Sequence, residues 1–484
     1  MKRMKRLATF FCLPLAAFLC LSGCASMAPP YTQPPTPISS AWPSGPAYQK
    51  GEGLPSDRAA ANLPWQEFFV DQKLQELIAL ALNNNRNLRI AALNIERSQA
   101  QYRIQRAELL PKVDGTIAGS GQGIPQDLTA TGKSMTAEQY SVGLGVSAFE
   151  LDLFGRVRSL QDAALEQYLA TAEARRAVQI SLIAEVAAGY LNLAADRDGL
   201  QLVRETLKAQ EESYQLIKRR LELGASSELD LRQAQTRVEA AKVDIARYTT
   251  LVAQDENALT LVVGSPVPAG LQPQALAETI AVVRDLAPGL PSEVLLRRPD
   301  VLAAEDLLKG VNANIGAARA AFFPRITLVG ALGTGSDQLG GLFNAGSLAW
   351  TFAPRITLPI FDNGSNLANL KVAEVDREIA VARYEKTIQT AFREVADALA
   401  QGGTINDQLA AQQSLTEAAV ASYRLSQARF EQGIDSYLNV LDAQRSLYGA
   451  QQGMIATRLT RLLNLVTLYK VLGGGECTPL LQTP

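Results

Sequence analysis

Two stretches of this chain share one outline: LELGASSELDLRQAQ at residues 221–235 and FEQGIDSYLNVLDAQ at residues 430–444. Their glycines, Gly224 and Gly433, lie 209 residues apart, and a serine, a leucine and a glutamine keep that spacing after each glycine. A glycine can end a helix in the left-handed conformation, and a serine can cap the start of the next helix. Each stretch therefore predicts the tip of a helical hairpin, and the equal spacing predicts an internal duplication.

Long sequences without proline surround both tips. None occurs between Pro125 and Pro266 or between Pro359 and Pro479, and Ala, Leu, Gln, Glu and Arg fill these runs. Because an interior proline costs a helix about 3 kcal/mol, such runs favour very long helices. Residues 160–221 alone would extend roughly 90 Å at 1.5 Å per residue. Between Leu216 and Leu261, apolar residues recur at three- and four-residue steps with alanines between them, which is typical of coiled-coil packing.

Strand-like alternation precedes each long helix. Large apolar side chains alternate with small or polar ones, and after residue 147 the pattern slips to Phe149 and Leu151, as a β-bulge would produce. The four candidate strands are residues 112–120, 140–147, 325–334 and 347–360, with exposed loops expected at 121–135 and 335–346. Each strand has roughly the 9–11 residues that a tilted strand needs to cross a bilayer. An open four-stranded sheet cannot lie in lipid, so either the sheet is soluble or several chains pool their strands into one barrel.

The composition argues against an enzyme. The chain has 484 residues, 47% of them hydrophobic, and its net charge of −2 gives no indication of nucleic-acid binding. It has no His, which removes the usual general base and the commonest zinc ligand. We find no G-x-S-x-G, P-loop or C-x-x-C motif and expect no metal or cofactor. Glu150 and Asp152 could be a carboxylate pair, but their place at a strand end predicts a solvated rim.

The N-terminus has the pattern of a secretory signal, with four basic residues followed by an apolar run at residues 7–21. It ends in Leu-Ser-Gly-Cys, which resembles a bacterial lipobox and predicts removal of residues 1–23 and lipid on Cys24. The alternative is an ordinary cleaved signal with a chance cysteine. Ala25 and Ser26 follow the cysteine, as in lipoproteins sent to the outer membrane. Residues 24–64 are rich in proline and predict an extended, lipid-anchored tether. Of the other cysteines only Cys477 remains, and it cannot form an internal disulfide.

The duplication divides the rest of the chain. A first repeat of one helix, two strands and a long helical hairpin covers residues 65–264, and a second covers residues 299–473. A connector at residues 265–298 lies between them, and a tail at 474–484 follows.

At this level of detail the chain resembles the outer-membrane factor family, the TolC/OprM-like efflux channels, and in particular its lipoprotein branch. The resemblance rests on Trp65 and Phe68 before the first helix, both tips, PSEVLLRRPDVLAAE at 291–305, FFPRITL at 322–328 and PIFDNG at 359–364. It implies an α+β membrane protein that forms a homotrimer, in which each chain gives four strands to a twelve-stranded barrel. The long helices would continue this barrel as an α-helical coiled-coil barrel.

The resemblance also implies a function. The protein would be a passive duct for small molecules such as drugs and toxic compounds, set in the outer membrane of a Gram-negative bacterium and extending into the periplasm. An inner-membrane pump would drive transport through a periplasmic adaptor. Ducts for metal or protein export are alternatives within the family. A non-transporting periplasmic scaffold is a further alternative, but it has no need of membrane-length strands.

Site residues follow from the resemblance at the two tips. Asp442 is the first candidate for a pore ring that closes the periplasmic end, with Asp230 and Asp435 as further candidates. The expected adaptor contacts are Gly224, Ser227, Leu229, Gly433, Ser436 and Leu438, although these residues could serve only to close the turns. The second tip departs from some relatives, since Phe430 replaces a tyrosine, Asp435 an arginine and Asn439 an aspartate. A different pairing, through Arg429 or Arg445, is therefore expected there.

Overall fold

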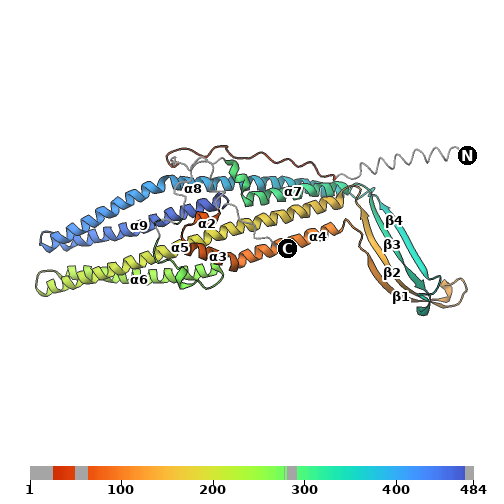
Figure 1. The fold of residues 1–484 in the computed structure, drawn as a ribbon, viewed down its shortest axis with the longest axis horizontal. Coiled ribbons are helices and arrows are strands. Elements are labelled where there is room, and N and C mark those ends of the chain that lie inside the picture. The colour runs from red at the N-terminus through yellow and green to blue at the C-terminus, as the bar shows by residue number, and fades with distance from the viewer. Residues whose placement is uncertain (1–25, 49–63, 277, 279, 281–291, 475–484) are drawn as a thin grey trace. The chain divides into compact units, whose positions relative to one another are not determined.

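The computed structural model of the protein describes residues 26–48, 64–276, 278, 280 and 292–474. The predicted signal peptide, Cys24 and Cys477 lie outside this range. The chain forms two compact units, and each is described by itself. The first unit contains the strands and residues 26–35, 94–172 and 303–384, and the second contains both hairpin tips (Figure 1).

The sheet of the first unit is antiparallel, with its strands in chain order. The strands are β1 (Asp114–Ile124), β2 (Met135–Leu151), β3 (Arg325–Ser336) and β4 (Leu348–Thr357). A register shift between Val146 and Phe149 confirms the predicted bulge. The first two strands extend further into the expected loop than predicted, because their pairing continues to Ile124 and Met135. Short 3-10 turns, η2 (Gln126–Leu128) and η5 (Leu339–Gly341), occupy the loops. β4 ends at Thr357, short of the predicted end at residue 360, because its last pairing partner is Arg325, the first residue of β3.

One face of the sheet is apolar and lies open in the single chain. Leu144, Leu332 and Trp350 pair across three strands, and 60–71% of each residue's surface is exposed. The same face carries Ile117, Val142, Leu328, Leu348, Phe352 and Ile356. The other face carries mainly small and polar residues, such as the row of Thr116, Gly143, Gly333 and Ala349. An apolar face outside and a polar face inside are typical of a membrane barrel strand set.

β2 of the first repeat and β3 of the second repeat lie very close together. Gly143 and Gly333 pair directly, and a Cβ on Gly333 would lie 2.2 Å from the carbonyl oxygen of Val142. Glycine is needed here because any side chain would collide with the backbone of the neighbouring strand.

Four helices contribute to the first unit: α4 (Arg86–Ala107), α5 (Arg156–Glu222), α7 (Pro299–Ala320) and α8 (Ser365–Glu431). Residues 26–33, which we call the N-terminal strap, have neither helix nor strand and pack against them. The Ser26 and Ser159 hydroxyls lie 2.9 Å apart, and Asn312 Nδ2 donates to the Pro29 carbonyl at 2.8 Å. Gly316 leaves room for the strap, since a Cβ there would lie 2.6 Å from the Ala28 nitrogen. This part of the expected tether is therefore extended but docked.

The second unit has an apolar core. Its further helices are α2 (Trp65–Phe68), α3 (Gln72–Asn84), α6 (Glu228–Val263), α9 (Tyr437–Val471) and the short η3 (Ala269–Leu271) and η4 (Ser292–Arg297). The rings of Phe68, Phe69 and Tyr469 lie 4.8–5.5 Å apart at the centre of the core. Asp71 caps α3 through the amides of its first turn and also accepts the Tyr190 hydroxyl at 3.1 Å.

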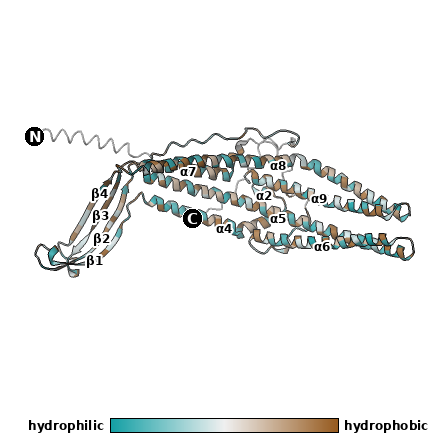
Figure 2. Ribbon diagram, turned by 180° about the vertical axis from the view of Figure 1, so that it is seen from behind, coloured by the Kyte–Doolittle hydropathy of each residue, from teal (hydrophilic) through white to brown (hydrophobic). Residues whose placement is uncertain are grey.

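Hydrophobic and hydrophilic residues interleave along the long helices (Figure 2). Among the described residues one helix, α5, has an 18-residue window apolar enough to cross a membrane, and 61% of that window is buried. Packing within the helical core accounts for that apolar character.

Candidate functional site

Both tips end their first helix as predicted. Gly224 and Gly433 each have φ of +73°. The amide of the residue after Gly224 donates to the Arg220 carbonyl at 2.7 Å, and the corresponding amide after Gly433 donates to the Arg429 carbonyl at 2.9 Å. These bonds from the end of the turn to the last helical carbonyls define a glycine-terminated helix.

The second helix of the first tip begins with a capping box. The Ser227 hydroxyl accepts the Asp230 amide at 3.1 Å, and the Asp230 carboxylate accepts the Ser227 amide at 3.0 Å. The carboxylate also accepts the hydroxyls of Ser227 and Ser226 at 2.8 and 3.0 Å. Burial raises the pKa of Asp230, but these hydrogen bonds outweigh burial and hold it below its ordinary value. The Asp230 side chain is thus engaged within its own tip.

The second tip is closed in a different way. Ser436 begins α9, but its side chain makes no capping hydrogen bond. Arg429 instead donates two bonds to Asp435, at 2.6 and 3.0 Å, and the bond from Arg429 lowers the pKa of that carboxyl. Arg445 pairs with Asp442 one helical turn away, and 62% of the Asp442 side chain is exposed. Both arginines that the sequence singled out are thus paired with aspartates of their own tip.

The two tips share a small apolar core. Ile217, Phe430, Tyr437 and Leu441 are buried together, and the Arg220 guanidinium covers the Phe430 ring at 4.5 Å. The Phe430 ring therefore has a cation over its face and packs against the Tyr437 ring, whose centroid is 5.3 Å away.

Each tip also presents an outward leucine. Leu229 is 65% exposed and Leu438 is 58% exposed, so neither is used by the core of its own chain. An exposed apolar side chain at the end of a hairpin is available to a partner.

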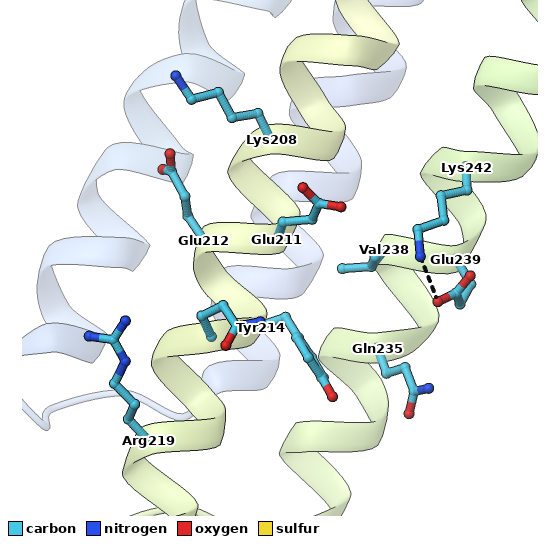
Figure 3. A pocket seen from close by; sticks show the side chains of 10 residues that line it. Lys208, Glu211, Glu212, Tyr214, Arg219, Gln235, Val238, Glu239 and Lys242 are labelled. Atoms are coloured by element: carbon cyan, nitrogen blue, oxygen red, sulfur yellow. Dashed lines mark hydrogen bonds and ion pairs between the residues drawn. The ribbon is translucent and has the colours of Figure 1, made fainter.

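A groove of about 720 Å³ runs beside the first tip, between α5 and α6 (Figure 3). Tyr214 and Val238 lie between the helices, and charged side chains surround them (Figure 3). The charged lining residues are Lys208, Glu211, Glu212, Arg219, Glu239 and Lys242. Lys242 binds Glu239 at 3.1 Å, and the mixture of signs suits a polar, reversible contact.

The predicted solvated rim at the end of β2 was wrong. The Glu150 and Asp152 side chains are only 11% and 10% exposed. Arg156 donates two bonds to Glu150, at 2.8 and 2.7 Å, while Arg158 binds Asp152. The chain turns at Gly155, where φ is +72°, so that the first residues of α5 fold back onto the strand end. Arg325 of β3 also lies 2.6 Å from Glu150.

Sequence reasoning also missed a buried arginine of the second unit. The Arg298 side chain is 9% exposed and binds Asp300 and Glu394, at 2.8 and 2.9 Å. It also donates to the Val471 carbonyl at 2.8 Å, which ties the start of α7 to the end of α9. The Arg-Arg-Pro-Asp motif at residues 297–300 was the available signal and contains Asp300, but the other two partners, Glu394 and the Val471 carbonyl, are 96 and 173 residues away.

The chain has an open sheet with one exposed apolar face and hairpins of very long helices. These features are typical of one subunit of an outer-membrane channel. The chain belongs to the outer membrane efflux protein family, whose model matches residues 77–265 and 290–474. Within this family three chains complete a twelve-stranded barrel that the long helices continue, and this chain is an outer-membrane component of an efflux system.

Three similar proteins illustrate the relationship. The toluene efflux pump outer membrane protein TtgC of Pseudomonas putida is 50% identical over 465 residues, which are 96% of this chain and 95% of that protein. The antibiotic efflux pump outer membrane protein ArpC, also of Pseudomonas putida, has the same identity and coverage. The crystal structure of the open MtrE outer membrane channel of Neisseria gonorrhoeae is similar with a TM-score of 0.84 and 40% identity, over 93% of this chain and 98% of that chain.

Proposed function

We propose that this protein is the exit duct of a tripartite pump for small toxic organic molecules, aromatic solvents and antibiotics among them. The main support for the proposal is that the sheet has one apolar and one polar face. A barrel built from it has lipid outside and water inside and needs no specific binding pocket. The named cargoes of the two Pseudomonas putida relatives support this class of substrate. The chain itself performs no chemistry, and an inner-membrane pump selects the cargo.

Deletion of the gene tests the cargo. The strain should lose tolerance to toluene, dyes, detergents and antibiotics and regain it when the gene is restored. Loss of metal tolerance alone would support metal export, and loss of a secreted protein alone would support protein export. Unchanged tolerance and secretion across the whole panel would count against an efflux role.

The tips are proposed as the docking site for a periplasmic adaptor. Gly224, Ser227, Gly433 and Ser436 shape the two turns, and Leu229 and Leu438 supply exposed apolar contacts. Leu229→Arg combined with Leu438→Arg should abolish resistance while the trimer still forms. Leu261→Arg, on a residue 79% exposed at the other end of α6, is the matched control. Equal loss of resistance in both variants, with trimers intact, would argue against docking at the tips.

Asp442 is proposed as the pore ring of the closed end. Its side chain is 62% exposed although Arg445 pairs with it, whereas Asp230 and Asp435 are less exposed and are bonded within their own tips. In planar bilayers Asp442→Ala should raise the conductance of the resting channel, and Asp230→Ala and Asp435→Ala should change it less. A pore as tight as the parent after Asp442→Ala would refute the assignment.

Cys24 is proposed as the lipid-bearing first residue of the mature protein. The strap supports this, because Ser26 is held against Ser159 only two residues further along the chain. The mass of the N-terminal peptide distinguishes the possibilities: acylation adds the mass of the lipid, and an ordinary cleaved signal leaves the cysteine unmodified.

A further inference from the structure

The two edge strands of the sheet carry complementary side chains. β1 and β4 each pair on one side only, so the trimeric barrel closes where β4 of one chain meets β1 of the next. The sheet has four antiparallel strands, so these two edges meet antiparallel. Their lengths match, at 11 and 10 residues.

The alternation of side chains between the two faces of the sheet restricts how β1 and β4 can pair. The residues of β1 that share a face with Leu144 must stay on the lipid side, so the register can change only by two residues at a time. Pairing along the full length places Asp114 opposite Thr357 of the neighbour. Both residues lie on the polar face in their own chains, as the pairing of Asp114 with Gly145 and of Thr357 with Arg325 shows.

In this register, small residues on the lipid side meet large ones. The lipid face of β1 carries Gly115, Gly119, Gly121 and Gly123, and a Cβ on either of the last two would touch nothing in its own chain. The lipid face of β4 carries side chains that are 64–71% exposed, namely Leu348, Trp350, Phe352 and Ile356. Each glycine faces one of these four across the seam, and a large side chain laid over a glycine stabilises edge pairing.

Charge complementarity points to the same register. Arg355 lies on the polar face two residues before Thr357, so it is diagonal to Asp114 of the neighbour. Diagonal neighbours lie about 7–8 Å apart at their backbones, which a long side chain can span. Both residues are exposed, and within the described part of the chain neither makes an ion pair.

We infer that the seam between protomers pairs Asp114 of β1 with Arg355 of the next chain on the polar face, with β1 glycines under the β4 aromatic and aliphatic side chains on the lipid face. The partner is a second copy of this chain. The inference rests on the trimeric barrel and specifies its register.

Disulfide trapping tests the register. In a Cys477→Ser background, Ala118→Cys and Ala353→Cys lie directly opposite across the proposed seam, at the separation of about 5 Å that a disulfide requires. Ala118→Cys with Ala349→Cys is the matched control, displaced by four residues or roughly 14 Å. Oxidised membranes should give covalent trimers from the first pair at least ~10-fold more than from the second, because only the first satisfies disulfide geometry. Trapping of the displaced pair instead would overturn the register.

Charge reversal tests the ion pair. Asp114→Arg and Arg355→Asp should each lower the temperature at which the trimer dissociates in detergent, and the double reversal should restore it. Additive losses in the double variant would overturn the ion pair. Both experiments use protein that still conducts ions in bilayers. A negative result then counts against the proposed register and not against the proposed function as a channel.

Discussion

The unequal caps of the two tips predict unequal responses to one substitution. Ser227→Ala removes a hydroxyl that accepts the Asp230 amide and donates to its carboxylate. Loss of such a cap costs about 1 kcal/mol, within a range of roughly 0.5–2 kcal/mol. Ser436→Ala removes a hydroxyl without a capping bond, so we expect a cost near zero.

Amide hydrogen exchange followed by mass spectrometry measures both tips in one protein. At about 1.4 kcal/mol per tenfold change, Ser227→Ala should speed exchange of the first-turn amides of α6 roughly fivefold. The peptide over residues 433–444 serves as the internal control and should not change. Ser227→Asn, which retains an acceptor at the cap, should restore slow exchange.

The reasoning fails if Ser436→Ala speeds exchange at its own tip as much as Ser227→Ala does at the first. It also fails if Ser227→Ala leaves the α6 amides unchanged. Either result would mean that packing of the shared core, rather than the cap, sets the local stability of the first tip.

Three further predictions concern the sheet, a carboxyl pair and the buried arginine. Gly333→Ala should destabilise the pairing of β2 with β3 by about 1–3 kcal/mol, because the added methyl group overpacks the contact, and should reduce the yield of heat-resistant trimer on gels. Gly335→Ala should have neither effect, because its nearest contact would be 3.8 Å away. Burial and the neighbouring Asp196 raise the pKa of Asp255 to about 6 from 3.8, so stability should fall as pH rises from about 4 to 6 and then level off. Asp255→Asn should flatten that part of the curve of unfolding temperature against pH, and an unchanged slope would contradict the raised pKa of Asp255. Arg298→Met should lower the free energy of unfolding by roughly 1–3 kcal/mol in denaturant titrations, because the Val471 carbonyl loses its donor while Asp300 and Glu394 remain partly solvated. A loss well below ~1 kcal/mol would show that the ion cluster matters little.

Sequence patterns were sufficient to predict features that depend on interactions between neighbouring residues. The glycine that ends a helix, the serine that starts the next and the slip from Val146 to Phe149 each depend on residues a few positions apart. The strand ends were less accurate, because pairing with a neighbouring strand decides where a strand stops.

Contacts between distant segments could not be predicted. The composition of the strap predicts a free tether. In the structure Ser26 contacts Ser159, 133 residues away, and Pro29 accepts a hydrogen bond from Asn312, 283 residues away. Glu150 likewise looked solvated because the backward turn at Gly155 and the approach of Arg325 leave no mark in its own strand. At the tips, the candidate aspartates were identified but their arginine partners could be given only as alternatives.

The two ways of closing a hairpin differ in their sensitivity to dissolved salt. The first tip is held by hydrogen bonds between Ser227 and Asp230 in direct contact, on which added ions have little effect. The second depends on an ion pair, Arg429 with Asp435, with 53% of the Arg429 side chain exposed, and such pairs weaken as ionic strength rises. A rise in the ionic strength of the periplasm should therefore loosen the second tip of each chain more than the first.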